Sequence, residues 1–374
     1  MTWLTWRQFR AQAITAVAAL AVFAILLAVT QSHMSGLYDA SGLTSCHGGA
    51  CTGPANTFLN QLASGRGVPL LPTGANAYVI LYFLSVVVIL VVPAIVGMFW
   101  GAPLIARELE TGTYRLTWNQ SVTRTRWLTV KLALIGVAAM VVTEAFSLLQ
   151  AWWAAPIGKA VGLGGSASIF SEGRYGPFVF PTHGIAPLGY AAFAFALGVA
   201  TGLLIRRPIP AMAVTLVIFG VVQFVTPLWI RPHLVPSSRT IATIQATGAN
   251  IYVPGRYTLV GPAGAVTRYT VAGSAGAVPG QPGAWILSSG FVNAAGQPVS
   301  TVPTACVPAI HALQGPRTEG RLDNCLASHG IRVTESYQPL SHYWPLQWAE
   351  TGLFLALALG LAAFCFWQLG RRRT

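Results

Sequence analysis

Four of the five cysteines have the type and spacing that most directly indicate covalent chemistry. They form two local pairs, Cys46 with Cys51 and Cys306 with Cys325. In an oxidising compartment such cysteines form disulfides, and of the three possible pairings the local one is the simplest. Zinc binding is the alternative, because a histidine lies near each pair. Neither histidine brings a second ligand pair at zinc-like spacing, so we expect no metal site.

Two acidic residues, Glu144 and Glu350, stand within long apolar stretches. Ionisable groups are costly inside a bilayer, so these residues are candidates for a functional role. Glu144 lies deeper in its stretch and is expected to face a bundle interior or a water-filled vestibule, with a helix-packing hydrogen bond as the alternative. Glu350 lies close enough to the end of its stretch to be solvated, and for it a structural role is favoured.

The sequence lacks the motifs of nucleotide hydrolysis and of common membrane enzymes. A Walker A loop ends in Gly-Lys-Ser/Thr, but Lys131 follows Val130 and Lys159 precedes Ala160, and these are the only lysines. His-Glu-x-x-His and Gly-x-Ser-x-Gly are absent too. The chain is therefore expected to be no enzyme by itself and to bind no cofactor.

Six apolar stretches are long enough to form transmembrane helices, each of which needs ~20 residues. Of the 374 residues, 54% are hydrophobic and only 8% are charged, which excludes an ordinary soluble domain. The first stretch exceeds the apolar core of a signal peptide and is interpreted as a span. The expected spans are Ala11–Val29, Ala77–Phe99, Leu128–Trp152, His183–Ile205, Ile209–Ile230 and Trp344–Trp367.

The basic residues predict that both termini are cytoplasmic, because Lys and Arg accumulate in cytoplasmic loops. With the N-terminus inside, twelve basic residues fall in roughly 60 cytoplasmic positions, and ten are spread over roughly 190 external ones. The net charge of +13 is thus explained by topology, and nucleic acid is not an expected partner. The twelve are Arg7, Arg10, Arg107, Arg115, Arg124, Arg126, Lys131, Arg206, Arg207, Arg371, Arg372 and Arg373.

The segment between the second and third spans, from Ala106 to Lys131, begins Ala-Arg-Glu-Leu-Glu-Thr-Gly-Thr. It resembles the loop of bacterial ABC exporter permeases of the six-helix type-2 class, which runs Arg-Glu, an acidic residue, Gly-Thr, a helical turn, a Pro-Val-Ser-like step, basic residues and Lys. The Trp-Arg-Gln-x-Arg opening and the entry to the last span resemble an actinobacterial-style branch. The resemblance covers roughly two thirds of the chain. Asn119-Gln120 replaces the family's Pro, which affects the expected turn geometry.

This resemblance implies a permease subunit of an ATP-driven exporter in the bacterial inner membrane. The permease would form its translocation path as a dimer, with a second copy or a homologous permease. ATP and Mg²⁺ would be bound by separate cytoplasmic ATPase subunits. Glu144 and Glu350 become candidates for the translocation path. The loop at 100–127 would dock the ATPase through Arg107, Glu108, Glu110, Gly112, Thr113, Arg115, Arg124 and Arg126.

The remaining segment, 231–343, is expected to be a disulfide-bonded external domain, which separates the spans of 1–230 from the last span and basic tail of 344–374. Its composition shifts to Gly, Pro, Thr, Ser and Val. Short β-prone runs at Arg256–Val260, Ala265–Val271 and Ala284–Val292 predict a small β-rich fold. A short helix around Cys325 is expected to stop near Gly330. The fold class is thus an all-α membrane protein with a small β-rich domain between the fifth and sixth spans.

Two other function classes compete with the exporter. A secondary transporter would show interrupted spans and several charges at the midplane, whereas here the midplane is nearly neutral. In a non-transporting receptor or anchor, the external domain would be the functional domain, and no acidic cytoplasmic loop would be needed. The cargo is not defined by the sequence, although a path poor in charge suits lipophilic or amphipathic molecules.

Overall fold

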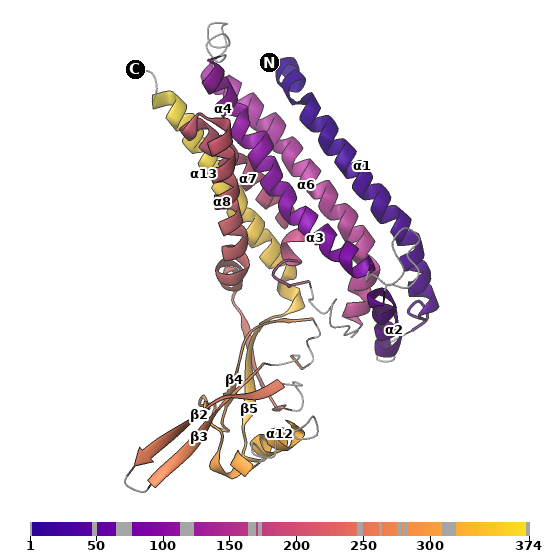
Figure 1. Cartoon of the computed structure of the whole chain (residues 1–374), viewed down its shortest axis with the longest axis vertical. Helices are drawn as coiled ribbons and strands as arrows, with labels where there is room; N and C mark the ends of the chain where they lie inside the picture. Colours follow the sequence, from indigo (N-terminus) through magenta and orange to yellow (C-terminus); the bar gives the residue numbers. More distant parts are fainter. Residues whose placement is uncertain are drawn as a thin grey trace. The chain divides into compact units, whose positions relative to one another are not determined.

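The computed structural model divides the chain into two compact units (Figure 1). The helical unit comprises Met1–Val235 with Trp344–Thr374, and the β unit comprises Pro236–Tyr343. The structure describes residues 2–46, 51–64, 77–112, 123–163, 170, 174–244, 250–261, 264–274, 278–279, 281, 283–308 and 319–371.

Among the described residues, six helical segments are long and apolar enough to cross a membrane, which confirms the number of spans expected. Several are longer than the apolar stretches expected from the sequence. The segments are Phe9–Ala40, Ala77–Thr111, Thr125–Gly162, Ala186–Ile205, Pro208–Leu234 and Leu340–Arg371.

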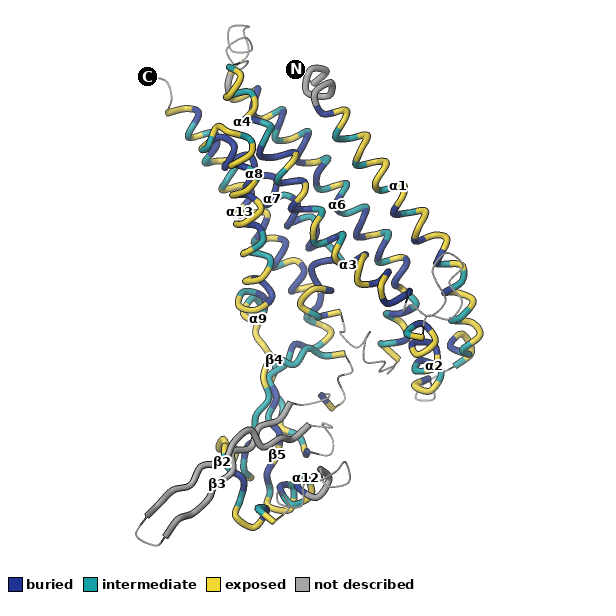
Figure 2. Tube along the Cα trace, viewed as in Figure 1, coloured by how far each residue is buried: buried dark blue, intermediate teal, exposed yellow. Residues whose placement is uncertain are grey.

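The first and third spans lie in the longest helices, α1 (Thr2–Ala40) and α6 (Arg124–Gly162). A short helix, α2 (Thr52–Ala63), follows α1 and buries Phe58 and Leu59 against the bundle. The fourth span is α7 (Ala186–Ile205), and the sixth lies in α13 (Tyr343–Arg371). Figure 2 shows that α7 is buried along most of its length, whereas much of α1 is exposed. An exposed apolar helix surface suits a lipid environment.

The second and fifth spans each contain a π-helical segment. The second runs through α3 (Ala77–Ile95), η2 (Val96–Gly101) and α4 (Ala102–Thr111). The fifth runs through α8 (Pro208–Val225), η4 (Thr226–Ile230) and α9 (Arg231–Leu234). Each π segment has a proline in or just before it, Pro93 and Pro227, and proline removes a backbone donor and disturbs the α-helical ladder. Such π segments are frequent at functional sites.

Glycines on α7 allow its backbone to contact the second span directly. A Cβ atom at Gly198 would lie 2.1 Å from the carbonyl oxygen of Gly97, and one at Gly202 would lie 2.3 Å from that of Ala102. Small residues at four-residue spacing permit this close helix approach in membranes, where van der Waals packing drives association. We call this contact between α7 and the η2–α4 segment the glycine seam.

Because of this close contact, even a methyl side chain at position 198 should destabilise the packing of the two spans. Gly198→Ala places a methyl group against backbone atoms that cannot rotate away, so the two spans must separate. We expect a loss of monodisperse protein and a lower melting temperature in size-exclusion and thermal-shift measurements. Gly360→Ala on α13 is the matched control, because a Cβ there meets no atom within 4 Å. Equal behaviour of the two variants would show that the seam is not tightly packed.

The β unit contains a three-stranded antiparallel sheet in the order β1-β5-β4, formed by Ser238–Ala242, Arg332–Gln338 and Trp285–Val292. A separate hairpin pairs β2 (Asn250–Gly261) with β3 (Gly264–Ser274). The β-prone runs recognised in the sequence therefore fall on strands.

Helix α12 (Glu319–Ser328) and the 3₁₀ turn η5 (Thr304–Cys306) pack against this sheet through a small apolar core. Leu322 and Leu326 of α12 contribute to that core, as does Val333 of β5. Gly330 has a positive φ of 72° just after α12, which fits the helix stop expected there.

Glu335 of β5 is fully buried, and neither carboxylate oxygen has a hydrogen-bond partner among the described residues. Burial raises the pKa of this carboxyl. The folded β unit therefore binds the Glu335 proton more tightly than the unfolded chain does. Its free energy of unfolding should decrease as pH rises from about 4.3, the unfolded value, to the raised pKa, and should remain reduced above it.

Glu335→Gln should remove this pH dependence and make the β unit more stable than the wild type at pH 7.5. Pulse proteolysis of the full chain at pH 5 and pH 7.5, following cleavage within Pro236–Tyr343, measures both effects. A variant less stable than the wild type at pH 7.5 would show that the carboxylate has a favourable partner.

Candidate functional site

At one end of the bundle, an ion pair joins the last turn of α4 to the first turns of α6. The Lys131 ammonium contacts the Glu108 carboxylate, and both side chains are largely buried. The ammonium also lies 4.7 Å from the centre of the Trp127 ring, a favourable cation–π distance. The two ends of the 112–123 segment are thereby held together by a charge pair.

The other residues expected to dock an ATPase are placed only in part. Arg107, Glu110 and Arg126 are exposed, and Gly112 ends α4 with a positive φ of 70°. Thr123 begins α6 as its N-cap and accepts a hydrogen bond from the backbone N–H of Arg126. Arg124 opens α6, and Thr113 and Arg115 lie outside the described residues. Glu108 therefore forms an ion pair within the chain, whereas Glu110 is exposed on the surface and can contact another subunit.

At the opposite end of the bundle, three spans meet around a buried charge pair. Glu350 of α13 accepts two hydrogen bonds from the Arg231 guanidinium, at 2.8 Å and 3.1 Å, and one from the Tyr190 hydroxyl at 2.6 Å. Both charged side chains are completely buried. The guanidinium also lies 4.3 Å from the centre of the Phe180 ring and donates to the Pro177 carbonyl oxygen at 3.4 Å. We call this set the Arg231–Glu350 cluster.

Gln347 extends the cluster by one turn of α13. Its side-chain oxygen accepts hydrogen bonds from the backbone N–H groups of Ile185 and Ala186, at 3.1 Å and 2.9 Å. Its side-chain nitrogen donates to the Phe180 carbonyl oxygen at 3.2 Å. The first turn of α7 has backbone donors without helical partners, and Gln347 satisfies two of them.

Glu350 corrects one expectation from the sequence, since it is fully buried rather than solvated. Pro177 and Phe180, which precede α7, contact its partner Arg231. Distance from a span end measured along the sequence does not reveal such contacts. Its partner Arg231 was not among the candidates, because it follows the apolar run of the fifth span directly. A lone Arg at that boundary, with a Glu in another span, is the signal that could have indicated the pair.

Glu144, the other acidic candidate, has no such charged partner in the described part of the chain. Its side chain is half-buried on α6, and its Oε2 atom is buried with no hydrogen-bond partner among the described residues. Nearby positions of α6 form a buried polar stripe of Thr143, Ser147 and Gln150. Ser147 donates to the Thr182 carbonyl oxygen at 2.8 Å, whereas Gln150 makes no side-chain hydrogen bond within the described part of the chain. This polar interior is unusual for a membrane span.

Apolar grooves open on the described part of the helical unit. One, of about 300 Å³, lies between α3 and α8 beneath Pro177 and Pro181, and Gln223 is the polar side chain that lines it. The Gln223 side chain donates weakly, at 3.5 Å, to the Leu90 carbonyl oxygen. The groove is thus bounded by the two spans that contain π segments.

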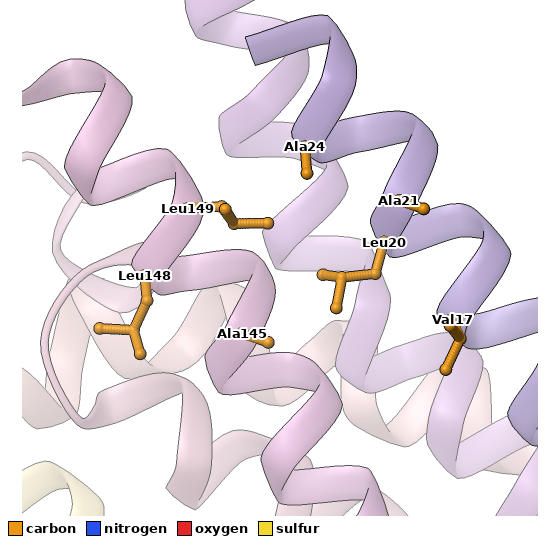
Figure 3. A pocket seen from close by; sticks show the side chains of 7 residues that line it. All are labelled: Val17, Leu20, Ala21, Ala24, Ala145, Leu148 and Leu149. Atoms are coloured by element: carbon orange, nitrogen blue, oxygen red, sulfur yellow. The ribbon is translucent and has the colours of Figure 1, made fainter. Parts of the chain in front are cut away.

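The second groove, of about 540 Å³, lies between α1 and α6 (Figure 3). Leu20 of α1 and Leu149 of α6 point toward one another between the two helices. The other lining residues are Val17, Ala21, Ala24, Ala145 and Leu148. All of its lining side chains are apolar, which suits contact with lipid chains.

Both predicted disulfides are present, Cys46–Cys51 and Cys306–Cys325. The fifth cysteine, Cys365, is buried on α13 with a free thiol.

The helices and the placement of charge define a multi-pass membrane protein. A family model described as ABC-2 membrane transporter related matches residues 17–231, which is more than half of the chain. The chain therefore belongs to this family of membrane transport subunits. Searches of curated proteins and of solved structures gave no significant match.

Proposed function

We propose that the chain is the permease subunit of an ATP-driven ABC exporter, which works as a dimer with separate cytoplasmic ATPase subunits. Family membership supports a transporter membrane subunit. The observation that carries the exporter assignment is the 106–131 segment, whose ends are joined by Glu108 and Lys131 while Glu110 stays exposed. Because the sequence has no Walker A motif, ATP and Mg²⁺ would bind on the partner subunit.

In this proposal the ion pair transmits the movement of the docking segment to two spans. A force on the 112–123 segment reaches α4 and α6 through the backbone, and the Glu108–Lys131 pair joins these two helices to each other. Largely buried charge pairs resist separation, because each partner would be left uncompensated in a low-dielectric environment. The second and third spans would then move together when ATP closes the ATPase subunits.

The same proposal places this end of the bundle in the cytoplasm of a bacterial inner membrane, with both termini inside. The Arg231–Glu350 cluster and the β unit would lie outside, with the β unit as an external domain between the fifth and sixth spans. The two disulfides support this placement, because disulfides persist in oxidising compartments.

The cargo path is proposed to follow the apolar surface where α3 and α8 meet. Val91 and Phe224 line the groove there with exposed apolar side chains, and Gln223 is its polar contact. A path of this kind suits a lipophilic or amphipathic cargo. The π segments in both bounding spans add local irregularity where the path must open.

Glu144→Gln tests whether the half-buried carboxylate takes part in transport. Glutamine keeps the shape and the hydrogen-bonding capacity of the side chain but removes its charge. We expect normal expression and melting temperature but reduced ATP-dependent export in proteoliposomes. Leu148→Ala on the exposed face of α6 serves as a control for packing. Unchanged export by Glu144→Gln would assign Glu144 a purely structural role.

The function itself is tested by reconstitution of the permease with a separate ABC ATPase subunit. Co-purification of the two subunits and ATP-dependent movement of a lipophilic dye across proteoliposomes are the expected results. Transport by the permease alone, driven by a proton gradient, would instead indicate a secondary transporter. Neither binding nor transport would favour a receptor or an anchor.

A further inference from the structure

His329 lies beside both sulfur atoms of the Cys306–Cys325 disulfide. Its Nδ1 atom is 3.7 Å from the Sγ atom of Cys306 and 3.9 Å from that of Cys325. Within the described part of the chain, this is the only group of three or more His, Cys, Asp or Glu ligand atoms close enough to hold a metal ion. The sequence had suggested that the histidine lacked suitable co-ligands, but folding brings Cys306 to it.

These distances match the geometry of a tetrahedral zinc-type site. Zinc binds cysteine sulfur at about 2.3 Å and histidine nitrogen at about 2.0 Å, so the ligand atoms around it lie about 3.5–3.8 Å apart. The imidazole nitrogen is therefore already at ligand distance from both sulfurs. Only the two sulfurs would have to separate, and their Cα atoms are 5.7 Å apart.

The core of the β unit holds the three residues in place independently of the disulfide. Cys306 is completely buried in this core, beside Leu322 and Leu326 of the helix that carries Cys325. His329 follows Cys325 by four residues, which places both side chains on the same side of the helix end. Opening the sulfur–sulfur bond therefore leaves the ligands close together.

We propose that reduction of this disulfide converts Cys306, Cys325 and His329 into a binding site for a zinc-class divalent cation. The reductant is a small thiol that reaches the compartment around the β unit when that compartment becomes reducing. Two reductant thiols supply two electrons and two protons, become one disulfide, and leave two cysteine thiols. The cation then displaces both thiol protons, and His329 binds as neutral imidazole through Nδ1 with its proton on Nε2.

The exposure of the ligands predicts a site with one open coordination position. Cys306 is buried, Cys325 is partly buried and His329 is exposed, so the cation would be held against the core with one side toward solvent. Sites with three protein ligands and one open position exchange that fourth ligand readily. Metal binding by the β unit would thus report the redox state of the compartment.

His329 has a competing contact, because its Nδ1 atom is also 2.9 Å from the Cys325 carbonyl oxygen. In the oxidised protein Nδ1–H donates to this carbonyl. His233 makes the same type of contact, at 2.8 Å to the Trp229 carbonyl oxygen, but belongs to no ligand group among the described residues. His233 is therefore the matched control for His329.

The test uses the full-length protein in detergent, carrying Cys46→Ser and Cys51→Ser so that only one disulfide can open. The protein is reduced with a phosphine, which is then removed, and titrated with Co²⁺. We expect one Co²⁺ per chain, with thiolate charge-transfer absorption in the near ultraviolet and visible bands of tetrahedral Co²⁺. Zn²⁺ should displace it, and the oxidised protein should not show these bands.

His329→Ala should weaken Co²⁺ binding by more than about tenfold, since loss of even an outer-shell partner costs that much. His233→Ala should leave binding unchanged. The proposal is overturned if the reduced protein binds Co²⁺ no more tightly than a further Cys306→Ser/Cys325→Ser variant, or if His329→Ala binds like its parent. A reduced β unit that is digested by protease and binds no Co²⁺ would overturn it as well.

Discussion

Glu350→Ala is expected to lower the free energy of unfolding of the helical unit by about 3–5 kcal/mol, the cost of leaving one partner of a buried ion pair uncompensated. Arg231 would remain completely buried and would lose two hydrogen bonds to the carboxylate. Differential scanning fluorimetry of the detergent-solubilised protein should show the largest decrease in melting temperature among single variants of the Arg231–Glu350 cluster. Tyr190→Phe should cost less, about 1.5–3 kcal/mol for one hydrogen bond to a charged group.

The double variant Arg231→Met/Glu350→Leu separates loss of charge compensation from loss of packing. Replacing a whole buried ion pair by apolar residues of similar size is often neutral or stabilising. The double variant should therefore melt at a higher temperature than Glu350→Ala alone. If Glu350→Ala melts like the wild type, the pair does not hold the three spans together.

The burial of Glu350 illustrates which features of the fold and site can be predicted from the sequence and which cannot. Span number and disulfide pairing depend on local features, namely stretch length and cysteine spacing, and both were predicted. The Arg231–Glu350 pair depends on residues 119 positions apart that meet only after the spans pack. The sequence also could not predict the ion pair between Glu108 and Lys131. An acidic residue in a basic loop could equally well contact another subunit.

Glu110→Ala is expected to have the largest effect on coupling. Glu110 is the exposed acid of α4, and truncating one side of a buried charge-assisted contact typically costs 2–5 kcal/mol, which corresponds to a loss of affinity of about 30-fold or more. Co-purification with the ATPase should fall, and ATP hydrolysis should become uncoupled from export. Binding of purified ATPase to the permease in nanodiscs measures the first effect directly.

Two controls separate docking from internal structure. Asp39→Ala removes an exposed acid in the last turn of α1, far from Glu110 in the sequence. This variant should leave ATPase binding unchanged. Glu108→Gln removes the charge pair with Lys131 and should lower transport more than it lowers ATPase binding, because its contact is internal. If Glu110→Ala binds its ATPase and exports normally, the docking assignment is wrong. If Glu108→Gln behaves like Glu110→Ala, both acids contact the partner.

The glycine seam has a mechanical consequence for such coupling. No side chain separates the backbones of α7 and the η2–α4 segment at Gly198 and Gly202, so these helices have no deformable layer between them. The η2–α4 segment of the second span and α7 should therefore move together. The 16 residues from Val96 to Thr111 extend about 24 Å at about 1.5 Å per residue. A tilt of about 13° around one end of this segment displaces the other end by about 5 Å, the length of one helical turn.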